Sequence, residues 1–229
     1  MRIKLIIATL TIILISVSVY SYTNLKASTK SSDFDNSIST TTDNKQKTVI
    51  DKTQTINEIS VIGDYALPTD LKEFEEWVDI ILIGSPTMPF LERKHEATYS
   101  SDGSLEDFFT RTEIEIEKVL KNNSDIKLKK DELFNIVEPS VGLIKESNNE
   151  STKITTGPYN ELEKDSVYLI FLKKNSNNDY AIALNVLGKY NIDDTDKKDT
   201  DVERYHYEYE SWKDLKQDYK KSLKKKYGF

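Results

Sequence analysis

Cysteine is absent from this chain of 229 residues. The fold therefore contains no disulfide, and a zinc site built on thiolates is excluded. No cysteine is available after an apolar N-terminal segment to carry a lipid, which excludes the common route by which bacterial lipoproteins are anchored.

Glycine and histidine are also scarce, with seven and two residues. So few glycines argue against a glycine-rich phosphate-binding loop, and the Gly-x-Ser-x-Gly motif of serine hydrolases does not occur. The two histidines, His95 and His206, lack the spacing of metal ligands, and we expect both to be solvated surface residues. The sequence therefore predicts no metal site and no cofactor, and it contains no recognisable catalytic motif.

The N-terminal segment (residues 1–27) has the pattern of an export signal. Arg2 and Lys4 are followed by residues 5–25, none of which is charged. Two interpretations remain open: a signal peptide cleaved near Ser21, or an uncleaved transmembrane anchor, since a helix of this length spans about 30 Å. In both, the rest of the chain works outside the cytoplasm, either secreted or anchored with its N terminus inside the cell.

The rest of the sequence divides by composition into three parts. Residues 28–55 are polar and almost free of apolar side chains, which predicts a disordered linker. Residues 56–192 predict one β-rich globular domain. Residues 193–229 predict an acidic loop, a tyrosine-rich segment and a basic C-terminal helix.

The first elements of the domain are predicted from local patterns. Asp70 followed by Glu73 forms a capping-box pattern that predicts the start of a helix, and the next apolar residues recur at helical spacing. The continuous apolar run 80–83 predicts a buried strand directly after this helix. Prolines, a glycine and many polar residues predict a long loop over residues 85–107.

Between residues 110 and 117, β-branched residues alternate with arginine and glutamate, which predicts a long strand with one wet face. Runs at 133–137, 167–172 and 179–190 predict further strands, the last with a bend at Gly188. We therefore expect a mainly β (α+β) fold: a small antiparallel β-barrel or sandwich of about five to six strands, with one N-terminal helix and a C-terminal helix.

Four segments follow an order that characterises one group of proteins. They are Asp79–Gly84, Glu115–Lys121, Leu162–Leu172 and Gly188–Tyr190. In this order the chain resembles uncharacterised exported or membrane-anchored proteins of Gram-positive, Bacillus-like bacteria. The resemblance implies an OB-like or netrin-like β-barrel domain, and it carries over no functional residue.

Two sets of carboxylates are candidates for chemistry. Glu113, Glu115 and Glu117 lie on one face of the predicted strand, where a row of carboxylates can bind a cation or act in acid–base catalysis, but close neighbours of like charge favour a solvated face. The acidic segment 193–201 fails the EF-hand pattern, because Arg204 stands where the calcium loop requires glycine. We expect this segment to be a plain acidic loop.

Four aromatic residues are candidates for ligand binding. Tyr205, Tyr207 and Tyr209 alternate with polar residues, and Trp212 follows. An extended backbone would place the three tyrosines on one side, where flat rings can bind a sugar or a peptide. The alternative, that they cover an open edge or end of the barrel, is favoured.

The C-terminal segment predicts a helix with a narrow apolar stripe and a basic surface. The stripe consists of Trp212, Leu215, Tyr219 and Leu223, and residues 212–227 hold seven lysines. The lysines suit contact with an anionic envelope polymer, although the preceding acidic segment offers an internal partner. The net charge of −7 argues against a nucleic-acid partner.

These patterns favour a non-catalytic extracytoplasmic module of the bacterial cell envelope, which binds an envelope component or a partner protein. The alternative is an envelope hydrolase that uses surface carboxylates such as Glu113 and Glu115. The membrane is an expected partner only through the N-terminal segment.

Overall fold

The computed structural model describes residues 56–61, 68, 70–145, 150–199 and 210–229, with only the backbone of Glu210 and Ser211. These residues belong to one compact unit, Asp51–Phe229. The predicted signal or anchor and the predicted linker lie outside the described residues. No helix in the described ranges has both the length and the apolar character that a membrane crossing requires.

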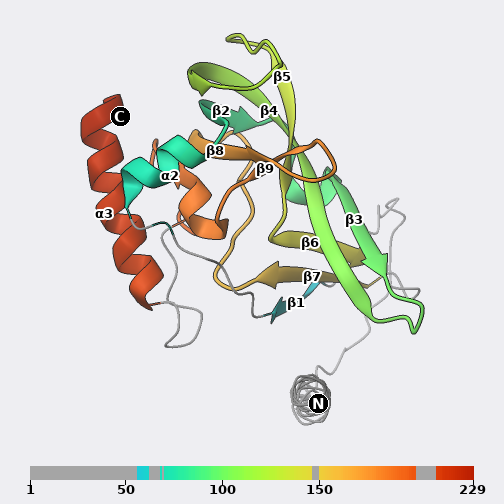
Figure 1. Cartoon of the computed structure of the whole chain (residues 1–229). Coiled ribbons are helices and arrows are strands. Elements are labelled where there is room, and N and C mark those ends of the chain that lie inside the picture. The colour runs from blue at the N-terminus through green and yellow to red at the C-terminus, as the bar shows by residue number, and fades with distance from the viewer. Residues whose placement is uncertain (1–55, 62–67, 69, 146–149, 200–209) are drawn as a thin grey trace, which may run out of the picture. The chain divides into compact units, whose positions relative to one another are not determined.

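The centre of the fold is a closed barrel of five strands (Figure 1). The strands are β2 (Ile80–Pro86), β4 (Leu105–Asn122), β5 (Leu133–Glu138), β8 (Tyr168–Lys174) and β9 (Tyr180–Ile182). Hydrogen-bonded pairing runs from β8 through β2, β4, β5 and β9 and returns to β8, mostly antiparallel, with one parallel bridge between β5 and β9. The predicted small β-barrel is confirmed.

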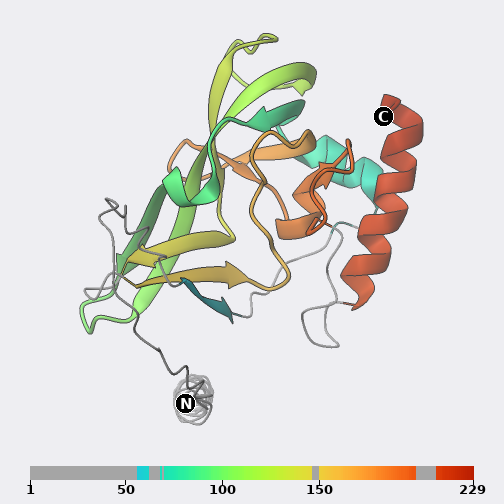
Figure 2. The same cartoon turned by 180° about the vertical axis from the view of Figure 1, so that it is seen from behind.

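Five further strands extend this barrel, so the fold has more strands than the sequence predicts. They are β1 (Ile56–Val61), β3 (Lys94–Tyr99), β6 (Val141–Lys145), β7 (Ser151–Thr156) and β10 (Lys189–Asn191). β10 pairs with β8, and β3 pairs with the first half of β4 to form an arm. β7 lies between β6 and a parallel β1 in a separate sheet, whose β6 side lies against the arm in both views (Figures 1 and 2). The loop predicted over residues 85–107 is therefore wrong where β3 forms.

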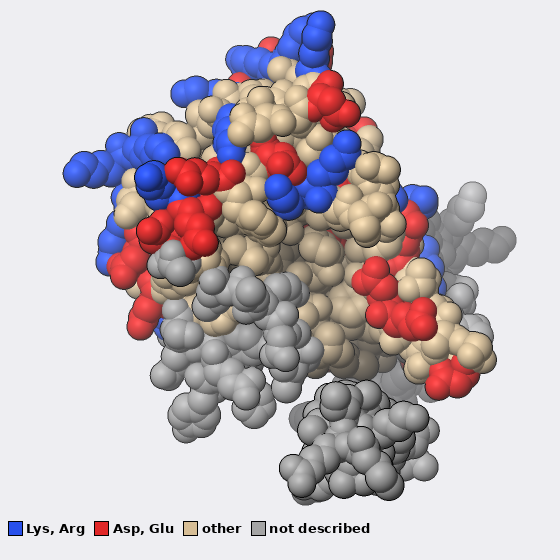
Figure 3. Space-filling model, in the orientation of Figure 1, with Lys and Arg blue, Asp and Glu red and all other residues tan. Residues whose placement is uncertain are grey.

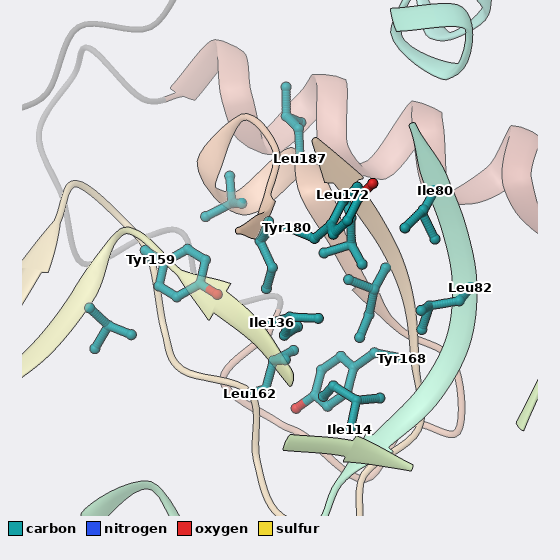
Figure 4. Close-up of a cluster of buried hydrophobic side chains, with 14 of the residues drawn as sticks. Ile80, Leu82, Ile114, Ile136, Tyr159, Leu162, Tyr168, Leu172, Tyr180 and Leu187 are labelled. Carbon is teal, nitrogen blue, oxygen red and sulfur yellow. The ribbon is translucent and has the colours of Figure 1, made fainter. Parts of the chain in front are cut away.

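The continuous apolar run of β2 is explained by burial on both faces. Ile80 and Leu82 point into the barrel (Figure 4), whereas Ile81 and Ile83 belong to a second core between the barrel wall and the helices. The β2–β4 ladder has two register shifts, and Gly84 lies directly after the second. A Cβ added at Gly84 would lie 2.5 Å from a methyl group of Ile114. The glycine lets the two strands approach closely as the barrel curves.

The first helix, α2 (Leu71–Trp77), begins and ends at identifiable partners. The carboxylate of Asp70 accepts a hydrogen bond from the backbone N–H of Glu73 at 2.8 Å, which confirms the predicted N-cap. The helix has no basic residue in its last turn. Lys121 of β4 takes that place, because its Nζ donates to the carbonyls of Glu75 at 2.6 Å and Val78 at 2.5 Å.

The C-terminal helix, α3 (Glu210–Tyr227), runs beside α2 on one side of the barrel (Figures 1 and 2). Its predicted stripe is confirmed, since Trp212, Tyr219 and Leu223 are buried and Leu215 packs against both cores. Two short 3₁₀ helices, η1 (Phe90–Glu92) and η2 (Asn185–Gly188), complete the described elements.

Glu138, at the end of β5, is fully buried and accepts hydrogen bonds from four directions. Its Oε1 accepts from Arg93 at 2.9 Å and from Thr112, and its Oε2 accepts from the hydroxyl of Tyr159 at 2.8 Å and the backbone N–H of Leu162 at 2.9 Å. Every carboxylate oxygen therefore has partners, as a buried charge requires.

Besides Glu138, Arg93 donates hydrogen bonds to two backbone carbonyls and, through Nη1, to the hydroxyl oxygen of Thr112 at 3.5 Å. Its Nε and Nη2 donate to the carbonyl of Met88 at 2.9 and 2.8 Å, and Nη2 also donates to the carbonyl of Leu162 at 2.7 Å. The pair with Glu138 thus joins the start of β3, the barrel wall and the connection between β7 and β8.

A second buried ionic cluster centres on Asp199. Its Oδ1 lies 2.8 Å from Lys216 Nζ of α3 and 3.4 Å from Lys189 Nζ of β10. The Lys189 Nζ also lies 5.2 and 5.3 Å from the ring centres of Tyr159 and Tyr168, where the ring faces partly compensate its charge. Residues 193–199 form a loop, as predicted, but Asp199 is buried within it. The predicted pairing of the acidic segment with lysines of the helix is confirmed.

Replacing Glu138 tests the first buried network. Glu138→Ala leaves the guanidinium of Arg93 buried without its carboxylate, so we expect the free energy of unfolding to fall by about 3–5 kcal/mol. Chemical denaturation monitored by circular dichroism measures this change. The matched control, Glu115→Ala on the exposed face of β4, should change stability by less than about 0.5 kcal/mol. Equal effects of the two substitutions would contradict the role given to Glu138.

Lys216 predicts a dependence of stability on alkaline pH. Burial lowers the pKa of Lys216 to about 8, below its ordinary value of 10.5, against the opposing attraction of Asp199. Between these values the unfolded chain binds more protons than the folded chain, so this group raises the free energy of unfolding as the pH rises, by up to about 1.4 kcal/mol per pH unit. The free energy of unfolding of the native chain and of Lys216→Met is measured by denaturation between pH 7.5 and 9.5. The two plots against pH should differ in slope by this amount. Parallel curves would show that Lys216 keeps an ordinary pKa.

Candidate functional site

The aromatic residues proposed from the sequence are only partly described. Tyr205, Tyr207 and Tyr209, together with His206, lie outside the described residues, so ligand binding by the tyrosine row stays a prediction. Trp212 is described and is 6% exposed, packed against the core inside the barrel. Its burial makes it a packing residue of α3 in this structure.

The glutamates of β4 lie on the outer face of the strand, as predicted. Glu113 accepts a hydrogen bond from the hydroxyl of Thr87 at 2.9 Å, and Glu117 accepts one from Ser85 at 3.3 Å. Glu115 is exposed. In the described part of the chain, no group of three or more histidine and acidic side chains is placed to hold a metal ion.

His95 is not a solvated histidine in a loop, and that expectation is wrong. It lies on β3 and is half-buried, because its ring packs edge-on against Phe90 with 4.7 Å between the ring centres. Its Nδ1 lies 2.9 Å from the hydroxyl oxygen of Thr110 on the paired strand. The local sequence gave no signal for this, since the partners of β3 come from β4.

A groove of about 420 Å³ opens between β3 and β6. This volume lies within the range of ~300–1,000 Å³ that is typical of ligand pockets. Eight residues line it: Arg93, Lys94, His95, Ala97, Tyr99, Leu143, Ile144 and Lys145. Strand pairing of β3 with β4 and of β6 with β7 brings these two stretches, about 45 positions apart, to the same hollow.

Each of the two strands borders the groove with an edge. In the described part of the chain β3 pairs only with β4, and β6 pairs only with β7. Consecutive residues of a strand point to opposite faces. Because the consecutive residues 93–95 and 143–145 all line the groove, the groove runs along the edges of the two strands and not along one face of either. Backbone groups therefore contribute to the groove beside the side chains.

The lining is basic, although the chain as a whole is acidic. Among the described residues, no carboxylate lines the groove. Lys94 pairs at 2.9 Å with Glu96, but this carboxylate is shared with Arg111. Lys145 ends β6 as an exposed cation. The groove therefore presents a positive rim around an apolar floor formed by Ala97 and Leu143.

The imidazole of His95 adds a proton-dependent charge. Burial lowers the pKa of His95, and the charges of Arg93 and Lys145 lower it further, while the carbonyl of Phe90 opposes the shift. The Nε2 atom is buried and makes no hydrogen bond to another described residue. His95 is therefore neutral at pH 7, and its protonation below that pH would make the groove more cationic.

The arrangement suits binding. It combines cationic groups, the half-exposed ring of Tyr99, an apolar floor and backbone edges, all of which recognise an anionic or extended ligand. A second hollow of about 450 Å³ lies between α2, β4 and the end of α3. Its charged residues hold the helices together, since Lys226 and the hydroxyl of Tyr227 both bind the carboxylate of Glu75.

A titration of His95 checks the electrostatics of the groove. We expect its midpoint to fall below 6.5, because the protonated ring is desolvated and faces like charges. The carbon-bound ring protons report the midpoint by NMR, and His95→Gln identifies the signal. Since the unfolded chain protonates first, His95 should lower the free energy of unfolding as the pH falls below about 6.5. A midpoint at or above 6.5 would contradict the described burial.

Comparison with known proteins assigns no family to this chain. No protein-family model matches it, and no curated protein matches it with significance. The resemblance to exported Gram-positive proteins stays a prediction, and the groove geometry carries the functional argument.

Proposed function

We propose that this chain is a non-catalytic extracytoplasmic binding module of the bacterial cell envelope. The N-terminal segment exports the domain or anchors it to the membrane. The β-barrel is a rigid support, and the groove between β3 and β6 receives the ligand, an envelope component or a partner protein.

The observation that carries this proposal is the groove itself. It joins a basic rim to two open strand edges, and its lining contains Tyr99, whose side chain is 52% exposed. A half-exposed tyrosine is a typical anchor of a binding surface, because a rigid ring buries much area at little entropic cost. The buried Arg93–Glu138 pair fixes the start of β3 and so preorganises one wall of the groove.

The carboxylates described in the structure support binding over hydrolysis. Glu138 is enclosed by its four partners, and the glutamates of β4 lie on the outer face of the strand away from the groove lining. Hydrolysis by a carboxylate pair requires two carboxyl groups that converge on one bond. The proposal therefore treats Glu113 and Glu115 as surface residues.

Site-specific photo-crosslinking tests the proposed binding face. A benzoylphenylalanine replaces Tyr99 in the full-length chain, which is then irradiated in a Gram-positive envelope preparation. We expect a crosslinked envelope species from position 99, because the ring lies at the groove. The matched position is Leu133, which is 59% exposed at the start of β5 and outside the groove. The same products from both positions, or none from position 99, would refute the groove as the binding site.

A further inference from the structure

We infer that the ligand of the groove is an extended acidic peptide segment of a partner protein, which adds as a strand to the open edge of β3. This inference rests on the proposed function and specifies the chemistry of its ligand. The backbone edge, the charge of the rim and the shape of the floor each support it.

Among the described residues, no strand pairs with the outer edge of β3, so its backbone offers hydrogen-bonding groups there. In an antiparallel ladder, alternate residues direct their N–H and C=O groups to opposite sides of the strand. Alternate residues of Lys94–Thr98, which precede the register shift between Thr98 and Tyr99, therefore direct these groups away from β4 and toward the open edge. An extended peptide satisfies such groups with its own backbone, which is the basis of recognition by strand addition.

Exposure distinguishes β3 from β6 as the pairing edge. Val141, Gly142 and Leu143 of β6 are buried, and the hydroxyl of Thr110 donates to the carbonyl of Val141 at 2.9 Å. No residue of β3 is fully buried. The outer part of β6 therefore forms the facing wall, with Lys145 at its end, while β3 offers the accessible edge.

The charges of the rim select an acidic partner. Lys94 and Lys145 line the groove, and no carboxylate is among its described lining residues. The ring of His95 adds a positive charge only when it is protonated. Acidic residues collect instead at the tip of the β3–β4 arm, where Asp102, Glu106 and Asp107 are exposed, and Figure 3 shows this acidic area over the arm. A basic segment would be attracted to that tip, whereas an acidic segment is drawn into the groove and repelled from its surroundings.

The floor of the groove fits alternate side chains of an added strand. Ala97 is the smallest residue of β3 and lines the groove between His95 and Tyr99, which line it two positions away on each side. Leu143 of β6 lines the same groove. A peptide with a small apolar residue between two acidic residues would place the former on the floor and the latter on the opposite face of the added strand, on the side of Lys94.

Hydrogen exchange of the full-length chain with designed peptides tests the inference. The probe is an acetylated and amidated heptapeptide in which three glutamates alternate with valines between terminal threonines. Two matched peptides carry lysine in place of each glutamate, or N-methyl groups on the valines that remove backbone donors. At millimolar concentration we expect the acidic peptide alone to slow amide exchange within residues 94–99.

The protein supplies its own controls. The edge strand β1 carries the exposed Ile59 and Val61 and lacks the basic rim, so its amides should exchange at an unchanged rate. Lys145→Glu should weaken the affinity for the acidic peptide about tenfold, and Lys145→Arg should preserve it. Lys129→Glu, whose side chain is 74% exposed on the β4–β5 connection, should leave the affinity unchanged.

The outcomes separate this inference from the proposed function. Strand addition is supported if the acidic peptide slows amide exchange in β3, if neither matched peptide does so, and if Lys145→Glu weakens the effect. No protection of β3, or equal protection by the lysine peptide, overturns the inference. If crosslinking at position 99 still yields an envelope polymer without a polypeptide, the proposed function survives and the peptide partner is wrong.

Discussion

The arrangement of the β3–β4 arm depends on one buried carboxylate, that of Glu138. Burying a charge costs several kcal/mol unless every lone pair finds a partner, and here Arg93, Thr112, Tyr159 and the backbone N–H of Leu162 provide them. These partners come from the start of the arm, the barrel wall and the chain that leads into β8. A single ion pair therefore joins three segments that are distant in the sequence.

The groove follows from this constraint. Arg93 is held by the carboxylate of Glu138 and the carbonyl of Met88, which fixes the position where β3 begins. From there β3 extends to β6 of the separate sheet. In the part of the chain that the structure describes, β3 and β6 come together without pairing, so their edges stay open and their side chains enclose a hollow. A rigid edge loses little entropy when a second strand adds to it, which is the physical reason why such a groove suits binding.

Much of the barrel could be predicted from local patterns. The apolar run of β2 indicates a strand that is buried on both faces, and the alternation in β4 indicates a strand that is buried on one face. Both segments are strands of the barrel. β3 has no such signal, since Lys94, His95 and Glu96 are polar and its stability comes from the ladder with β4. Local reasoning expected a solvated His95 for the same reason.

The sequence by itself determined the mainly β fold, the capped helix α2 and the apolar stripe of α3, because each depends on spacing within a few residues. Only the tertiary structure decided where the buried charges lie and where the surface is hollowed. Glu138 and Arg93 are 45 positions apart, and the two walls of the groove are also distant in the sequence. Whether a polar residue is buried and paired or exposed depends on partners that chain folding brings from a distance, and local spacing contains no record of them.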